Sequence, residues 1–144
     1  MKKIIKLSMI CGLLLLGGCA ANDAGNNVVE ETKNTKETTT LHIEVKDEVN
    51  NKELYNGDIS VEGNVETLYD FLDKADELQV VAEDGQYGKT LMGMMGVETE
   101  DFNKGPWWMY ESENNDSCQA AGQCDAMSSL KIEDGDSFTF RFMK

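Results

Sequence analysis

The sequence contains one histidine, one proline and few basic residues, with 13 Lys and Arg against 27 Asp and Glu, for a formal net charge of −14 at pH 7. This balance argues against a protein that binds nucleic acid through phosphate contacts, and against docking on an anionic lipid surface by charge. No catalytic triad containing histidine could form without His42. His42 falls on the polar side of an alternating segment, so we interpret it as a surface residue, with a catalytic or metal-binding role as the alternative.

Two familiar site motifs are incomplete. Gly88-Lys89-Thr90 matches the end of a phosphate-binding loop, but Glu83 stands where that loop needs its first glycine. Asp134-Gly135-Asp136 lacks the remaining spacing of an EF-hand, and we interpret it as a turn before the last strand, with calcium binding as the alternative. Because no spacing of Ser, Cys or paired carboxylates argues for catalysis, we expect the protein not to be an enzyme.

The N-terminus has the features of an export signal. A short basic head precedes an apolar run that is too short to span a bilayer comfortably. The run ends in Leu16-Gly17-Gly18-Cys19, which resembles the bacterial lipobox. We therefore predict a signal peptide over residues 1–18 and a lipidated (palmitate-bearing) Cys19 that holds the protein at the extracytoplasmic face of the cell membrane. An ordinary secretory signal and an uncleaved anchor are the alternatives.

The next segment is poor in residues that could form a core. Residues 20–40 contain no aromatic and almost no large apolar side chain, so they cannot bury enough surface to offset the entropy of ordering. We predict a flexible tether over residues 19–40 and one domain over residues 41–144. We find no internal repeat.

The cysteines of the predicted domain are Cys118 and Cys124. Cys11 would leave with the signal peptide and Cys19 would carry lipid. The spacing of the remaining pair is not that of a C-x-x-C redox motif or a zinc knuckle, and an exported protein meets an oxidising environment. We predict a Cys118–Cys124 disulfide. Two free thiols, or a pair that supplies two metal ligands, are the alternatives.

Periodicity predicts an α+β fold. One helix with an apolar face is expected within residues 64–78, with Asn64 as its N-cap. Residues 50–64 predict either one strand or a hairpin that turns at Asn56-Gly57. The other strands are expected in the remaining alternating or apolar segments, namely 41–46, 78–83, 85–97, 107–112, the start of 130–137, and 138–144. In the last of these, Phe138, Phe140 and Phe142 share one face. The order favours a β-grasp-like roll, a mostly antiparallel sheet with one helix packed on one face.

The aromatic strand has two faces. Alternation places Trp108 and Tyr110 on one side, and Trp107 and Met109 on the other together with Glu111. Since Glu111 should avoid the core, we predict that Trp108 and Tyr110 point inward.

Trp107 and Met109 would then form an apolar platform for a flat ligand, with Tyr87 expected nearby. Packing of Trp107 under a loop is the alternative. The candidate ligand-binding set therefore comprises Trp107, Trp108, Met109, Tyr110 and Tyr87.

The order of these segments resembles the transcobalamin-like C-terminal domain family, which was long catalogued in bacteria as a domain of unknown function. The resemblance rests on "TLYDFLDKA", "YGKTLMGMMGV", "WWMY" and "LKIEDGDSFTFRF", and covers most of residues 41–144. It implies a β-grasp fold, and its vertebrate relatives form the smaller of two domains that sandwich cobalamin. Two features depart from the family: Asn114-Asn115 and the cysteine loop replace an Asn-Gly turn, and the large helical domain is missing.

Two functions follow as hypotheses. The first is a tethered module that binds a small ligand, with a cobalamin-like molecule as the candidate and no intrinsic cofactor. The second is a non-catalytic interaction or structural module that meets an envelope or transporter protein. Accessibility of Trp107 is the feature expected to separate them.

Overall fold

A computed structural model describes residues 37–144. The predicted signal peptide, Cys19 and residues 20–36 of the predicted tether lie outside these described residues. Within 37–144, no helix is both long enough and apolar enough to cross a membrane.

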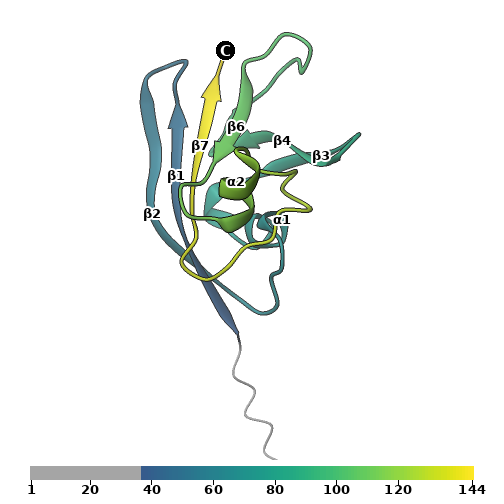
Figure 1. Cartoon of the computed structure of the whole chain (residues 1–144). Helices are drawn as coiled ribbons and strands as arrows, with labels where there is room; N and C mark the ends of the chain where they lie inside the picture. Colours follow the sequence, from purple (N-terminus) through teal and green to yellow (C-terminus); the bar gives the residue numbers. More distant parts are fainter. Residues whose placement is uncertain (1–36) are drawn as a thin grey trace, which may run out of the picture. The chain divides into compact units, whose positions relative to one another are not determined.

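A four-stranded sheet forms the centre of the fold, in the order β2-β1-β7-β6 (Figure 1). Its strands are β1 (Thr38–Asp47), β2 (Lys52–Glu62), β6 (Trp107–Glu111) and β7 (Ser137–Met143). The first and last strands, β1 and β7, pair in parallel, whereas β1–β2 and β6–β7 are antiparallel. This arrangement confirms the predicted α+β class, and β1 begins at Thr38 rather than at Leu41.

The central strands bury one face, as their alternation predicts. Leu41, Ile43 and Val45 of β1 are fully buried, and the three phenylalanines of β7 lie beside them with at most 5% exposure. Because parallel register places Ile43 next to Phe138 and Val45 next to Phe140, these side chains form one continuous apolar layer. β6 pairs with β7 at the edge of this layer.

A second, smaller sheet consists of β3 (Val81–Gly85), β4 (Gly88–Met94) and β5 (Val97–Glu98), in that order. In Figure 1 the β3–β4 hairpin projects away from the four-stranded sheet. Most of the segments that we predicted as strands thus divide between two sheets, which periodicity alone does not distinguish. The strand predicted at the start of 130–137 was wrong, because Lys131 forms only an isolated bridge with Thr67.

The first hairpin turns earlier than Asn56-Gly57, so the alternative hairpin prediction was wrong. β2 runs without a break through these two residues, and the turn lies between Asp47 and Lys52. The buried Asp47 carboxylate accepts hydrogen bonds from the backbone N–H and the side-chain amide of Asn50, at 3.0 and 2.7 Å. An aspartate that closes its own turn in this way outweighs the Asn-Gly signal further along.

Helix α1 (Leu68–Leu72) is shorter than predicted, and its N-cap is Thr67 rather than Asn64. The Thr67 hydroxyl accepts from the backbone N–H of Asp70, and the Asp70 carboxylate accepts from the backbone N–H of Thr67 at 2.9 Å. This reciprocal capping box satisfies two free donors, which Asn64 could not do at its position. A 3₁₀ turn, η1 (Asp76–Leu78), follows. The predicted apolar face of Leu68, Phe71, Leu72 and Ala75 is buried.

Candidate functional site

Trp108 faces the core, as predicted from the alternation of β6. Its side chain is 6% exposed, and its ring lies 5.1 Å from that of Phe142, centroid to centroid. The indole N–H donates to the carbonyl of Val97 at 3.1 Å, so the buried donor has a partner. Trp108 therefore joins the β6–β7 pair to the smaller sheet.

Tyr110 follows on the same face. Its ring lies 5.7 Å from that of Phe140, and its hydroxyl donates to the carbonyl of Asp125 at 2.7 Å. Burial raises the pKa of Tyr110 to about 12, because the phenolate would lose its hydration. Tyr110 thus anchors the segment that follows the cysteine loop and keeps its proton at physiological pH.

Trp107 lies on the opposite face and folds back over its own loop. Its indole N–H donates to the carbonyl of Phe102 at 2.7 Å, and its ring packs directly against Gly105. A Cβ at Gly105, where φ is +68°, would lie only 2.8 Å from that ring, so the position needs glycine. The loop before β6, which contains Phe102 and Gly105, therefore covers the Trp107 ring and leaves it half-buried.

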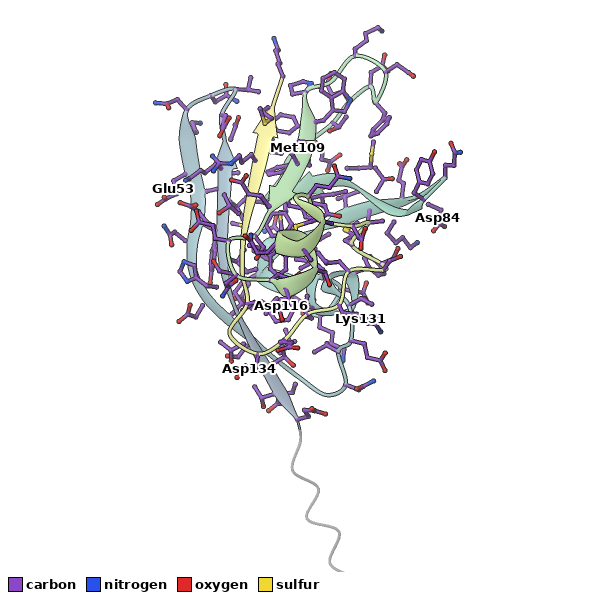
Figure 2. All side chains as sticks on the ribbon, in the orientation of Figure 1. Glu53, Asp84, Met109, Asp116, Lys131 and Asp134 are labelled. Carbon is purple, nitrogen blue, oxygen red and sulfur yellow. A yellow bond between two sulfur atoms is a disulfide. The ribbon has the colours of Figure 1, made fainter. Side chains whose placement is uncertain are left out.

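The remaining predicted platform residues lie apart. Met109 is 57% exposed on the outer face of β6, whereas Tyr87 is 82% exposed in the turn of the β3–β4 hairpin. Figure 2 labels Met109 on β6 and Asp84 on β3 near that turn, on separate parts of the molecule.

A groove of about 710 Å³ lies next to Met109. Its lining combines three parts of the chain: β6 and the residues after it, the end of β7, and the cysteine loop. Its lining residues are Met109, Tyr110, Glu111, Ser112, Glu113, Cys118, Gln119, Gly122, Gln123, Cys124, Arg141 and Met143. Met109 and Tyr110 from the predicted set line the groove, but Trp107, Trp108 and Tyr87 do not.

One wall of this groove is a helix that the sequence analysis missed, α2 (Asp116–Ala121). Its N-cap is Asn115, whose side chain accepts from the backbone N–H of Cys118 at 3.2 Å. Gly122 ends the helix with a left-handed conformation, at φ 72°. The signal was present, because an Asn N-cap followed by a glycine after the last turn is typical of a short helix.

Buried polar contacts hold the start of α2. The amide of Asn115 donates to the carbonyl of Lys131 at 2.9 Å and to the carboxylate of Asp136 at 2.7 Å. Asp136 also accepts from the backbone N–H of Glu133 at 3.0 Å. Asn115 and Asp136 are 3% and 6% exposed, so this cluster fixes α2 to the turn before β7.

The structure contains the predicted Cys118–Cys124 disulfide, which closes α2 and the residues after it into a small loop. Cys118 is 4% exposed and belongs to the hydrophobic core, whereas Cys124 is half-buried. Both cysteines line the groove. The disulfide is therefore part of the groove's surface as well as a link in the fold.

Arg141 supplies the positive charge of the groove. Its guanidinium forms ion pairs of 2.7 Å with Glu48 and with Glu111. These two carboxylates raise the pKa of Arg141 above its ordinary value. Arg141 thereby ties β6 and β7 to the turn after β1, and its charge within the groove is already compensated.

The residues that we considered for metal binding, His42 and Asp134, each have a structural contact. His42 is hydrogen-bonded through Nδ1 to Asp58 at 2.7 Å on the exposed side of β1, and Asp134 accepts from the backbone N–H of Thr40 at 2.7 Å. Gly135 adopts φ +90°, which confirms a turn at Asp134–Asp136. Over residues 37–144, no group of three or more His, Cys, Asp or Glu side chains could hold a metal ion.

Comparison with known proteins shows likeness in fold. No family model matches the chain, and no curated protein matches it. Among solved structures, a "putative metal binding protein" from Ruminococcus gnavus is similar over 72% of this chain and 94% of its own, with 17% identity and a TM-score of 0.52. Haptocorrin in complex with Cbi is similar over 77% of this chain, with 16% identity and a TM-score of 0.54.

This chain spans only 26% of haptocorrin. At such identities the likeness shows the fold alone. A fold shared with part of haptocorrin agrees with the structural side of the transcobalamin-like resemblance.

Proposed function

We propose that this protein is a non-catalytic module that binds a small ligand in the groove between β6 and α2. The groove itself carries the proposal: its volume of about 710 Å³ falls in the range of small-molecule sites, roughly 300–1,000 Å³. The thioethers of Met109 and Met143 and the disulfide give it apolar surface. The amides of Gln119 and Gln123 add groups that can hydrogen-bond a ligand.

A cobalamin-like molecule is the first candidate ligand. The fold shared with part of haptocorrin, whose structure holds Cbi, supports this choice. Because the chain spans a quarter of that protein, it would cover one side of such a ligand and bind it more weakly than two domains that enclose it.

Equilibrium dialysis of the purified protein against cyanocobalamin and against Cbi tests this proposal. We expect saturable binding at one site per chain. No saturable binding up to about 1 mM, which corresponds to only about −4 kcal/mol, would remove the corrinoids as candidates.

Attachment to the membrane is the second part of the proposal, and it rests on the lipobox-like sequence before Cys19. We propose that lipid on Cys19 holds the module at the extracytoplasmic face. Replacing Cys19 by Ala should release the protein from the membrane fraction and change the mass of its N-terminal peptide. A variant that stays membrane-bound with the same processing site would contradict the lipoprotein proposal.

An interaction module is the alternative function. Met109 and Phe102 are 57% and 55% exposed, and such large apolar side chains are common at surfaces that meet another protein. If corrinoids do not bind, the protein should be used as bait on solubilised membranes, with Met109→Ala as the matched bait. A partner retained by the parent and lost with Met109→Ala would support this alternative. A partner retained equally by both baits would contradict a role for this surface.

A further inference from the structure

The disulfide is the main apolar attachment of the groove's helical wall. Of the six residues of α2, Cys118 is the one that is buried, and the other five are exposed. An isolated helix of this length is unstable in water, because it cannot recover the cost of nucleation. The position of α2 must therefore come from its attachments to the rest of the domain.

Those attachments are uneven along the helix. At its start, Asn115 caps α2 and bonds the turn before β7, and the side-chain amide of Gln119 donates to the carbonyl of Ser112 at 2.6 Å. Beyond Gln119, the next hydrogen bond to the body of the domain is the one from Tyr110 to the carbonyl of Asp125. Between these points the Cys118–Cys124 disulfide supplies the link. It thus closes the part of the wall that, among residues 37–144, has no hydrogen bond to the rest of the domain.

We propose that the groove is redox-dependent: it is formed in the disulfide-bonded protein and opens when a thiol reduces Cys118–Cys124. The proposal rests on the proposed function, because it concerns the same groove. It also has a reciprocal side. If the disulfide favours ligand binding, then a bound ligand must protect the disulfide by the same free energy.

The reductant is a dithiol. One thiolate attacks Sγ of Cys124, the more exposed of the two cysteines, and Cys118 leaves as a thiolate that takes up a proton. The second thiol of the reductant then attacks the mixed disulfide and releases Cys124. Two electrons and two protons pass to the protein, and the dithiol becomes a disulfide. Because both cysteines line the groove, an occupant covers the sulfur that must be attacked.

The first experiment needs no ligand. Amide hydrogen exchange is compared between the oxidised full-length protein, the same protein after reduction with dithiothreitol and alkylation, and a Cys124→Ser variant that keeps the buried Cys118. Exchange over residues 116–121 should become about 10- to 100-fold faster without the disulfide, as the loop-closure model gives for so short a loop. The central strands β1 and β7 should not change. Equal exchange of residues 116–121 in all three samples would overturn the proposal.

The second experiment uses cyanocobalamin. The affinity of the protein for cyanocobalamin should fall at least 10-fold when the disulfide is reduced and return when it is reoxidised. Saturating cyanocobalamin should also slow the reduction of the disulfide by dithiothreitol, which is measured from the masses of the cysteine-containing peptides. Binding that is unchanged by reduction would overturn the proposal while leaving the proposed function intact. If cyanocobalamin does not bind at all, the corrinoid function fails, and the exchange experiment still decides whether the disulfide holds α2.

Discussion

The two faces of strand β6 differ in what covers them. On the inner face, Trp108 and Tyr110 pack against phenylalanines of β7 and donate to backbone carbonyls of other segments. On the outer face, Trp107 is covered by its own loop, and Met109 stays exposed at the groove. Side chains one residue apart thus serve the core and the surface, because a strand directs successive residues to opposite sides. The candidate site therefore lies on the outer face of β6 and along its edge toward α2.

The largest expected difference is between the two tryptophans. Trp108→Ala should lower the free energy of unfolding by about 3–5 kcal/mol, since it leaves a cavity beside Phe142 and removes the hydrogen bond to the Val97 carbonyl. Trp107→Ala removes a half-buried ring that contacts a loop and should cost less than half as much. Urea denaturation of both variants measures the difference. Equal, large losses would mean that both faces of β6 belong to the core.

A smaller effect is expected at the start of the helical wall. Asn115→Ala removes the cap of α2 and one partner of the buried Asp136 carboxylate, which should cost about 1–3 kcal/mol. The exposed Ser117 on the same helix provides the control, and Ser117→Ala should change stability by less than about 0.5 kcal/mol. Thermal unfolding of the two variants tests the role of the cluster. Matching melting temperatures would show that the Asn115 contacts do not support the wall.

A further effect appears only at alkaline pH. The folded protein holds the Tyr110 proton up to about pH 12, whereas an unfolded chain releases it near pH 10. The contribution of Tyr110 to stability is therefore fully present below about pH 10 and is lost as the pH rises toward 12. Tyr110→Phe should flatten the decline of stability over this interval. Parallel profiles for the parent and the variant, measured by urea denaturation at several pH values, would exclude Tyr110 as the cause.

The sequence predicted the features that depend on local alternation and spacing. The inward pair on β6, the phenylalanine face of β7 and the disulfide are all present. Alternation predicts which residues of a strand share a face, and the folded sheet keeps that arrangement. The transcobalamin-like resemblance implied the type of fold, but it did not predict the positions of the residues that line the groove.

Other features depend on contacts that the alternation of apolar residues does not reveal. The turn at Asp47 and the cap at Thr67 replace the turn and the cap that we predicted, and each is held by a specific hydrogen bond. The groove brings β6, β7 and α2 together, and no helix was predicted at residues 116–121. Tyr87 was expected near Trp107, but it lies in the turn of a hairpin in the other sheet.

The most direct test of the groove as the ligand site compares two exposed side chains. Met109 lines the groove and Tyr87 does not, and both are mostly exposed, so neither Met109→Ala nor Tyr87→Ala should change stability by more than about 0.5 kcal/mol. Equilibrium dialysis against cyanocobalamin then reports binding alone. The account predicts that Met109→Ala weakens binding about 5- to 30-fold, as the loss of one apolar contact of 1–2 kcal/mol gives, while Tyr87→Ala binds like the parent. Unchanged binding by Met109→Ala together with weakened binding by Tyr87→Ala would contradict it.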